Sequence, residues 1–301
     1  MKNLIITSML LLGTIACLTA SPKERQKVSQ YLQDISVTIR SEVGYSKSEG
    51  SGVLVNRTID KEKVTFVWTC AHVIKNLRSV RSVIEHGAPK KIVEFDDARI
   101  IKELVESGRR VGEIKMDATV VKYSAADDGE DLALLMVRAK DYGKSSAKFY
   151  LNKEPKIIPI GTPLYHVGSL LGQMGANSMT TGIISQIGRI HSKVEFDQTT
   201  VTAFPGSSGG GVFLQTGEYV GMIARGAGEG FNLMIPIRRM ERWAKKHEIL
   251  WALDTKVKAP PMEDIIKLPV ENRSKSEHEE NLKGKSIAEN FKDIKYLIRY
   301  N

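Results

Sequence analysis

Short apolar strands separated by glycines and polar turns are the feature that most restricts the fold of this sequence. Between about residues 35 and 145 the runs alternate with period two or are rich in β-branched residues, as in "ISVTIRSEVG", "GSGVLVN", "VTFVWTCAHVI", "ATVVKYS" and "LALLMVRA". A second set lies between about residues 155 and 237, with "TPLYHVGSL", "MTTGIISQIGRI", "TTVTAF", "GGVFLQ", "YVGMIARGAG" and "FNLMIPI". Two sets of about six strands predict an all-β fold of two six-stranded antiparallel β-barrels side by side.

The strand pattern ends at Pro236. Beyond it, "IRRMERWAKKHEILWAL" has apolar residues near helical spacing, and the proline suits a first helical position, so we expect a closing helix over residues 237–253. Residues 257–301 are rich in Lys, Glu, Asn and Ser and have no sustained period. This composition predicts a polar, disordered tail after one domain that covers residues 35–253.

The N-terminus has the form of an export signal. "MKNLIITSMLLLGTIACLTASPKERQ" begins with a basic residue, continues as an uncharged apolar run and ends in a charged stretch, so we interpret residues 1–20 as a signal peptide or a lipoprotein signal. Cleavage after Ala20, lipidation of Cys17 in "TIAC" and an uncleaved membrane anchor are all open. The predicted location is periplasmic, secreted or anchored to the membrane by the N-terminus. With Cys70 as the only other cysteine, we expect a fold without an internal disulfide.

Composition and charge narrow the class of function. Hydrophobic residues make up 42% and charged residues 26%, which is the balance of a globular protein. The net charge is +9, but basic residues alternate with acidic ones, and no Lys/Arg block is interleaved with aromatic residues. We therefore interpret the charge as a solvated surface and expect no nucleic-acid partner. Membrane contact is expected only through the N-terminal signal or a lipidated Cys17.

A glycine-rich stretch with two serines stands out in the second half of the chain. "AFPGSSGGGVF", residues 203–213, places the serines between a Pro-Gly turn and three glycines. It is consistent with a hairpin turn, because glycine adopts positive φ and serine is common in turns. It also suits a nucleophile at Ser208, with backbone N–H groups converging on the oxygen of a substrate carbonyl. The choice depends on whether a base and an acid occur elsewhere.

A serine nucleophile needs a histidine base and an acid. His72 lies in "WTCAHVI", just past an apolar strand and beside two small residues. Asp131 immediately precedes "LALLMV", where a carboxylate at the edge of a core strand is kept ionised and oriented. His166 and His191 lie in strand-like alternation, and we assign them structural or surface roles. The candidates for this chemistry are therefore His72, Asp131 and Ser208.

The order of these residues and the motifs around them resemble the chymotrypsin-fold serine endopeptidases, and within them the HtrA/Deg-like branch. "GSGVLV" resembles the first-barrel opening of that branch, "TCAHVI" its histidine motif, "DLALL" its aspartate motif and "PGSSGGGVF" its nucleophile motif. "HVGSLLG" with "MTTGIISQIGR" resembles the second-barrel entry, and "GEYVGMIARG" with "GFNLMIPI" the closing strands. The resemblance runs from about Ile35 to Leu253. No PDZ-like module is expected, because the tail beyond it is short and polar.

The resemblance implies hydrolysis of peptide or protein substrates, with no metal and no cofactor. Ser208 attacks a peptide carbonyl while His72 takes its proton, and Asp131 orients the ring and stabilises its positive charge. The backbone N–H groups of Gly206 and Ser208 are the expected oxyanion hole, with Ser207 between them. The product of the first step is an acyl-enzyme.

The substrate pocket is expected between residues 200–204, the segment before Ser208, and residues 224–226 together with 230–232. Its predicted residues are Thr202, Ala224, Arg225 and Gly226. Because the segment before Ser208 holds no acid, a preference for Lys or Arg is not expected, and small or medium apolar side chains fit better. Arg225 either recruits an acidic group or is an exposed arginine on a strand.

The sequence also departs from the family pattern. Ser207 stands where Asn or Asp is common and Gly211 where proline is common, and either change can loosen the oxyanion loop. The interval from His72 to Asp131 is longer than usual, with the excess at about residues 78–115. There "RIIKELVESGRRVGEIKM" is interpreted as an extra hairpin, turning at Ser107-Gly108. A lid, a docking surface and surface decoration are all open for it, and decoration is preferred. The alternative function is a catalytically silent peptide- or protein-binding protein on the same fold.

Overall fold

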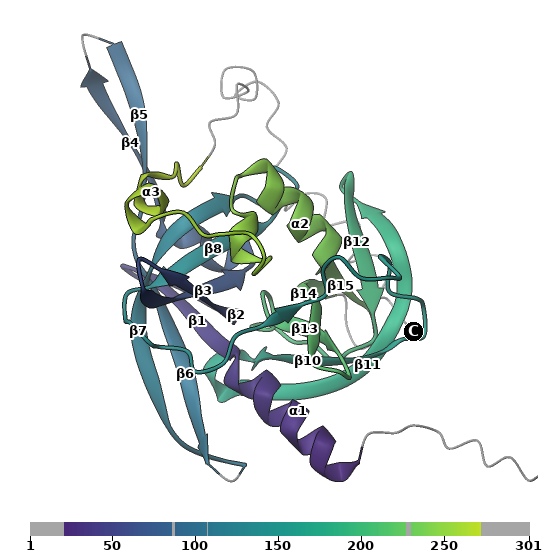
Figure 1. The fold of residues 1–301 in the computed structure, drawn as a ribbon. Helices are drawn as coiled ribbons and strands as arrows, with labels where there is room; N and C mark the ends of the chain where they lie inside the picture. The colour runs from purple at the N-terminus through teal and green to yellow at the C-terminus, as the bar shows by residue number, and fades with distance from the viewer. Residues whose placement is uncertain (1–20, 86–87, 107, 227–229, 272–301) are drawn as a thin grey trace, which may run out of the picture.

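Two β-barrels hold most of the chain (Figure 1). The computed structural model describes residues 21–85, 88–106, 108–226 and 230–271. The signal predicted for residues 1–20, including Cys17, and the tail residues 272–301 lie outside the described residues.

The first barrel closes six antiparallel strands in the order β1-β2-β3-β8-β7-β6. These strands are β1 (Ser36–Val43), β2 (Ser46–Ile59), β3 (Glu62–Thr69), β6 (Ala98–Glu106), β7 (Arg109–Ser124) and β8 (Leu132–Val137). Phe66 and Trp68 of β3 are fully buried, and β3 is a central strand whose β-branched and aromatic residues fit the packed interior. Closure leaves this barrel with no free sheet edge.

The second barrel contains six antiparallel strands in the order β13-β10-β11-β12-β15-β14 and closes by the pairing of β13 with β14. These strands are β10 (Pro163–Leu170), β11 (Gly175–His191), β12 (Val194–Thr199), β13 (Gly211–Leu214), β14 (Glu218–Gly226) and β15 (Asn232–Pro236). A two-residue strand, β9 (Lys148–Phe149), adds in parallel to β14. The predicted fold of two six-stranded barrels is confirmed, with β9 as an addition.

The segment between His72 and Asp131 differs from its prediction. The predicted strand pair forms, with Glu106 opposite Arg109, but its strands β6 and β7 belong to the first barrel and run on beyond it as a ribbon (Figure 1). The addition to the barrel is instead the separate hairpin of β4 (Arg78–Glu85) and β5 (Ala88–Phe95). Sequence alternation does not distinguish an added hairpin from barrel strands that extend past the barrel, since a strand keeps the same period where it leaves the barrel.

The C-terminal helix is shorter than predicted. α2 (Ile237–Lys246) ends before a short 3-10 turn, η3 (Leu250–Ala252), so the range 237–253 is not one continuous helix. The apolar residues of this segment still cover the first barrel: the Trp243 ring lies edge-on to Trp68 at 5.7 Å, and the Trp68 indole N–H donates to Ala252 O at 3.0 Å. Closure by this segment therefore depends on tryptophan packing.

The beginning of the predicted tail is ordered. Residues 257–271 include α3 (Met262–Lys267), and they lie against the first barrel through hydrogen bonds from Lys122 Nζ to Pro269 O at 2.7 Å and from Tyr123 N to Val270 O at 2.9 Å. The expectation of disorder from residue 257 therefore differs from the structure over this stretch. Composition alone missed these contacts because they join segments far apart in the chain.

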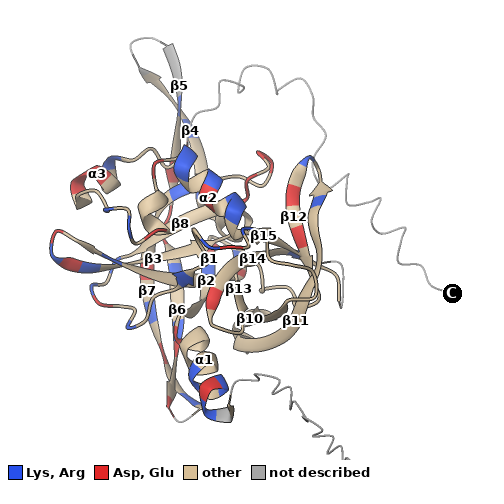
Figure 2. Cartoon of the chain, turned by 45° about the vertical axis from the view of Figure 1, so that its right-hand side comes forward, with Lys and Arg blue, Asp and Glu red and all other residues tan. Residues whose placement is uncertain are grey.

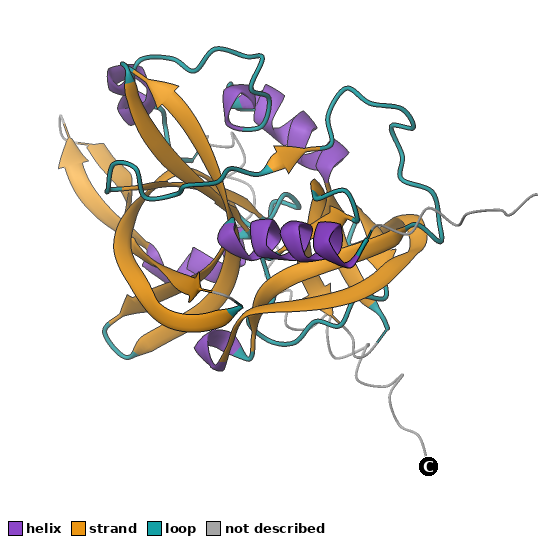
Figure 3. Cartoon of the chain, turned by 60° about the horizontal axis from the view of Figure 1, so that its bottom comes forward, coloured by secondary structure: helices purple, strands orange, loops and turns teal. Residues whose placement is uncertain are grey.

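A helix that the sequence reading did not assign precedes the first barrel. α1 (Pro22–Asp34) begins at a capping box made by Ser21 and Glu24 and lies against the outside of the strands (Figure 3). Gln33 Nε2 donates to Asn177 O of β11 at 3.1 Å, and Lys102 Nζ of β6 pairs with Asp34 at 2.5 Å. The helix thus contacts both barrels.

Charged side chains of both signs lie among one another on the two barrels (Figure 2). This distribution agrees with the interpretation of the net charge as a solvated surface. Within the described ranges, every helix is too short or too polar to cross a bilayer.

Candidate active site

His72 and Asp131 meet where two paired strands of the first barrel begin and end. β3 pairs with β8, which places Thr69 opposite Ala133. His72 follows β3 in the 3-10 turn η1 (Ala71–Leu77), and Asp131 directly precedes β8. Residues 59 positions apart in sequence therefore face each other across the end of one strand pair.

The Asp131 carboxylate binds both the ring and the backbone of His72. His72 Nδ1 lies 2.9 Å from Oδ2 and 3.0 Å from Oδ1, and the His72 backbone N–H donates to Oδ1 at 3.0 Å. Since a carboxylate is an acceptor only, Nδ1 carries the proton and Nε2 is the acceptor of a neutral ring. The Asp131 side chain is 2% exposed and that of His72 is 35% exposed. One end of the ring is buried against its acid, and the other is open to a reactant.

Arg239 of α2 supports this pair, and sequence reasoning missed it. Its guanidinium, on a residue that is 4% exposed, donates to Gly129 O at 2.8 Å and to Glu130 O, and it lies 4.8 Å from the centre of the Phe196 ring. It therefore fixes the two residues before Asp131, which itself has a φ of 54°. In the sequence, Arg238 and Arg239 are adjacent charged residues on an expected helix. Nothing in the sequence shows that the Arg239 side chain is buried.

Ser208 lies in the loop between β12 and β13, and the first barrel binds that loop. The Ser51 N–H donates to Ser208 O at 2.7 Å, and the Ser51 hydroxyl donates to Gly206 O at 2.7 Å. Gly209 has φ +83°, and a Cβ there would lie 2.2 Å from Ser51 O. Only glycine allows so close an approach with this φ. The loop that carries Ser208 is thus packed directly against the "GSG" stretch within strand β2.

Two backbone N–H groups of this loop are available to a ligand. Neither Gly206 nor Ser208 donates its N–H to any other residue in the described ranges. The carbonyls that precede them are both bound: Pro205 O accepts from Leu171 N at 2.7 Å, and Ser207 O accepts from Gly210 N at 2.9 Å. Unsatisfied donors of this kind are what an oxyanion requires.

The two departures from the family pattern are both accommodated. The Ser207 side chain is buried, and its Oγ accepts from Phe204 N at 3.1 Å. Gly211 is the first residue of β13, where a Cβ would meet the Phe213 ring at 2.3 Å. Ser207 thus makes a hydrogen bond within the loop, and the absence of a side chain at Gly211 leaves room for the Phe213 ring.

The Ser208 hydroxyl donates to Ala224 O at 3.4 Å. Within the part of the chain that the structure describes, no hydrogen bond joins Ser208 Oγ to His72 Nε2. Long or absent hydrogen bonds between catalytic groups are common before a substrate binds. Ala224 begins the predicted pocket wall, so the structure brings that wall to Ser208.

The other predicted pocket residues lie on either side of this contact. Thr202 accepts from the Thr180 hydroxyl through its carbonyl at 2.9 Å, and Gly226 pairs with Asn232 across β14 and β15. Arg225 is half-buried, with its guanidinium 5.9 Å from the centre of the Phe196 ring. Asn232, the last residue of the pocket wall predicted over residues 230–232, is fully buried and donates to Val201 O at 2.7 Å.

A cavity of about 110 Å³ lies behind the acid, between the Asp131 loop and the hairpin of β11 and β12. Its walls are Ala126, Asp127, Gly129, Asp131, His191, Ser192, Val194, Phe196 and Arg225. This volume is below that of a typical small-molecule site, which is about 300 Å³ or more. It suits one side chain of a longer ligand.

His166, His191 and Cys70 take no part in the hydrogen bonds that join His72 to Asp131. His166 is fully buried with Nδ1 3.0 Å from Gly211 O, and burial lowers its pKa to about 4, so it is neutral near pH 7. The pKa of His191 is lowered by burial and by the nearby Arg225. The Cys70 Sγ lies within 4.8 Å of ligand atoms of His72 and Asp131. Burial raises the pKa of its thiol well above the usual value, which keeps it protonated and a poor metal ligand.

Comparison with known proteins agrees with this geometry. Residues 50–222, more than half of the chain, match the model of the trypsin-like peptidase domain. The chain belongs to the trypsin-like peptidase family. It is 26% identical over 167 residues to the "Serine protease HtrA-like" of Staphylococcus aureus (strain NCTC 8325 / PS 47), covering 50% of this chain and 21% of that protein. It is 33% identical over 117 residues to the "Serine protease Do-like HtrA" of Lactococcus lactis subsp. cremoris (strain MG1363), covering 36% and 27%.

Solved structures show the same fold. A serine endoprotease from Yersinia pestis superposes with a TM-score of 0.54 at 18% identity, covering 77% of this chain and 68% of that one. Deg5 superposes with a TM-score of 0.53 at 18% identity, covering 79% and 99%. The family member described here thus has the double barrel of HtrA-like proteins, while it spans about a quarter or less of the curated relatives' lengths.

Proposed function

We propose that this chain is a serine endopeptidase that hydrolyses peptide bonds through an acyl-enzyme on Ser208. The observation that carries the proposal is the contact of His72 Nδ1 with the buried Asp131 carboxylate at 2.9 Å, in a member of the trypsin-like peptidase family. A binding protein on this fold has no need of a histidine whose tautomer is fixed in this way. Peptide or protein chains are the proposed substrates.

The first half of the reaction forms the acyl-enzyme. His72 Nε2 accepts the Ser208 Oγ proton as the oxygen attacks the substrate carbonyl carbon. The negative oxygen of the tetrahedral intermediate accepts hydrogen bonds from the N–H groups of Gly206 and Ser208, and Asp131 stabilises the imidazolium. His72 then gives the proton to the leaving amine as the peptide bond breaks.

The second half releases the acid product. Water gives a proton to His72 Nε2 and attacks the ester carbon, and the second tetrahedral intermediate uses the same two N–H groups. Ser208 Oγ regains the proton when the ester breaks. The first half requires the Ser208 hydroxyl to leave Ala224 O and turn toward His72, a rotation about a side-chain bond between staggered positions.

For the substrate, we propose that a small or medium uncharged side chain enters beside Thr202, Ala224 and Gly226. These residues contribute backbone, a methyl group and a hydroxyl, and no acid, so they lack a counter-ion for Lys or Arg. Arg225 stands between this pocket and the cavity behind Asp131 and is proposed to contact a residue farther along the substrate.

We also propose that the protein acts outside the cytoplasm, through the signal-like residues 1–20. Fractionation of cells that express the full chain tests this. Residence in the cytoplasmic fraction, with residues 1–20 retained in the intact mass, contradicts it.

Labelling by a fluorophosphonate, which phosphonylates only activated serines, tests the function. We expect one adduct on the full chain by intact mass, no adduct on Ser208→Ala, and cleavage of denatured casein that is lost in the same variant. Ser79→Ala is the control, because it removes an exposed hydroxyl from the β4–β5 hairpin, outside both barrels, and should keep the adduct. A wild-type chain that neither labels nor cleaves across neutral pH overturns the proposal.

A further inference from the structure

The segment between β10 and β11 lies directly behind the nucleophile loop. This segment, residues 171–174, contains the 3-10 turn η2 (Gly172–Met174), and its Leu171 N–H donates to Pro205 O at 2.7 Å. Pro205 O and the Gly206 N–H belong to one peptide group, and in a trans peptide the two point in opposite directions. The bond from Leu171 therefore sets the direction of the Gly206 N–H.

The segment and the loop are in backbone contact at this place. Gly206 has φ +97°, and a Cβ built on it would lie 2.2 Å from Ser169 O and 2.5 Å from Gly172 N. No space separates the two pieces of chain, so a displacement of residues 171–174 displaces the Pro205–Gly206 peptide.

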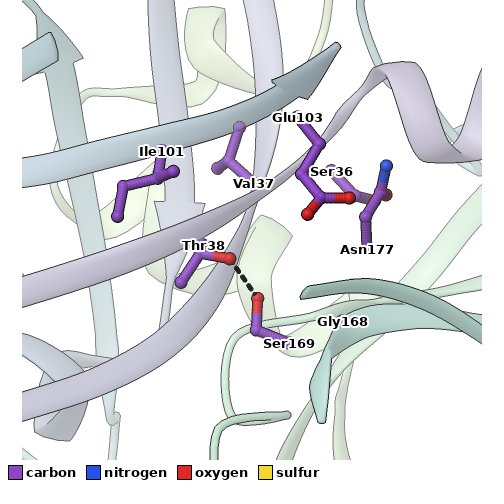
Figure 4. Close-up of a pocket in the computed structure, with 8 residues that line it drawn as sticks. All are labelled: Ser36, Val37, Thr38, Ile101, Glu103, Gly168, Ser169 and Asn177. Carbon is purple, nitrogen blue, oxygen red and sulfur yellow. Dashed lines mark hydrogen bonds between the residues drawn. The ribbon is translucent and has the colours of Figure 1, made fainter. Parts of the chain in front are cut away.

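The first barrel holds the beginning of the segment. The Ser169 N–H donates to Ser51 Oγ at 2.7 Å, and the Ser169 hydroxyl lies 2.5 Å from the Thr38 hydroxyl (Figure 4). The seam around this pair, which Glu103 and Asn177 also line, has no room for a water molecule. The first barrel therefore holds Ser169, two residues before the segment, in place.

Gln173 holds the other end of the segment. Its N–H donates to Glu49 Oε2 at 3.0 Å, and its side-chain oxygen accepts from Arg40. Arg40 and Glu49 are themselves paired at 2.8 Å. Both the backbone and the side chain of Gln173 are therefore bound by the first barrel.

The ribbon of β6 and β7 supplies the last contact. Gln173 Nε2 donates to Glu113 Oε2 at 3.0 Å. Arg110 and Lys115 lie 2.7 and 2.6 Å from the Glu113 carboxylate, and the pKa of Glu113 is lowered, first by its hydrogen bond with Lys115. Glu113 is thus a charged acceptor at neutral pH, and hydrogen bonds to charged acceptors are the stronger ones.

We infer that Gln173 and Glu113 are positioning residues for the oxyanion hole: they hold residues 171–174 so that Leu171 aims the Gly206 N–H. This inference rests on the proposed function. Neither residue contacts Ser208 or His72 in the described structure; both act through the bond from Leu171 to Pro205. Under this inference the part of β7 beyond the barrel has a positioning role, whereas the sequence favours decoration.

The test measures the rate of fluorophosphonate labelling on the full chain, since the phosphonyl oxygen occupies the oxyanion hole. Gln173→Ala should lower that rate by about 10-fold or more, a part of the roughly 100- to 1,000-fold that loss of a whole donor causes. For a cleaved peptide, kcat should fall while KM stays near the wild-type value. The thermal midpoint should change little, because Gln173 is half-buried in a loop.

An exchange of the two side chains separates positioning from general damage. Gln173→Glu alone places a carboxylate against Glu113 and should lower the rate at least as far as Gln173→Ala. Adding Glu113→Gln restores a donor and an acceptor in reverse order and should recover most of the lost rate. Glu106→Gln is the matched control on the same ribbon; its side chain is exposed and makes no ion pair with the described residues, so its rate should equal that of wild type.

The outcomes are distinct. Wild-type labelling by Gln173→Ala, or failure of the exchange to restore the rate in a chain with wild-type thermal stability, overturns the inference while the proposed function stands. A wild-type chain that does not label at all overturns the proposed function and this inference with it.

Discussion

The two barrels hold their shares of the site by different means. The first barrel holds His72 and Asp131 through side-chain contacts at the ends of two paired strands. The second barrel presents Ser208 on a loop of small residues. In this loop Pro205 O and Ser207 O accept hydrogen bonds, while the N–H groups of Gly206 and Ser208 donate to no other described residue. A change in the first region therefore alters a functional group, whereas a change in the second alters the direction of a peptide. Substitutions should separate the two effects.

The largest effect should come from the side-chain part of the site. Asp131→Asn keeps the shape but replaces the acceptor that faces His72 Nδ1 with an amide that can donate. The ring then favours the tautomer with the proton on Nε2, which cannot accept the Ser208 proton. We expect kcat/KM for a peptide substrate to fall about 10,000-fold.

Thermal unfolding provides the control for this variant. The midpoint of Asp131→Asn should stay near that of wild type, since the amide still accepts from the His72 backbone N–H. Wild-type hydrolysis by this variant would contradict the assignment of Asp131, whatever its stability.

A smaller effect should come from the backbone part of the site. Ser51→Ala removes the hydroxyl that donates to Gly206 O and accepts from Ser169 N. These two backbone groups then lose a hydrogen-bond partner in a buried or partly buried place. We expect the free energy of unfolding to fall by about 1–3 kcal/mol and kcat to fall by about 10-fold, as the donor peptide gains freedom. Urea denaturation and steady-state kinetics on the same preparation measure both quantities.

Ser36→Ala is the matched control for Ser51→Ala. Ser36 is a buried serine at the start of β1 whose hydroxyl donates to Leu32 O at 2.8 Å, away from Ser208. It should lose stability and keep kcat. Equal losses of kcat in the two variants would show that Ser51 acts only through stability.

The smallest effect at neutral pH should come from a histidine that the chemistry does not use. Burial lowers the pKa of His166 to about 4, below the value of about 6.5 for an unfolded chain. As the pH falls from about 6.5 to 4, the unfolded chain binds this proton before the folded one, so His166 lowers stability in that window by up to about 3 kcal/mol. Above about pH 6.5 the His166 ring is neutral in both the folded and the unfolded chain, so it does not lower the stability there.

His166→Gln tests this by removing the titrating ring and keeping a donor for Gly211 O. Urea midpoints measured at pH 7 and at pH 4.5 should differ less in the variant than in wild type. Identical pH dependence of the two proteins would contradict a neutral buried His166. Activity at pH 7 should be unchanged.

What could be predicted from the sequence was local. The strands follow from alternation within a few residues. His72 and Ser208 stand beside small residues and Asp131 stands directly before an apolar run, so these three residues were also visible. The contributions of Arg239, Ser51 and Leu171 were not visible. Each acts on a backbone group far away in sequence, and a carbonyl acceptor leaves no mark on the residue that bears it. The C-terminal residues 257–271 were missed for the same reason.

The bonds of Ser51 have a consequence for the order in which the molecule becomes active. Ser51 belongs to the first barrel, yet its N–H and hydroxyl bind Ser208 O and Gly206 O of the second. A chain in which only one barrel has formed lacks either the histidine or the shaped loop. Under the proposed function, such a chain is inert toward its own unfolded segments and toward other new chains. Docking of the two barrels is therefore the step that brings His72, Asp131 and the loop of Ser208 together.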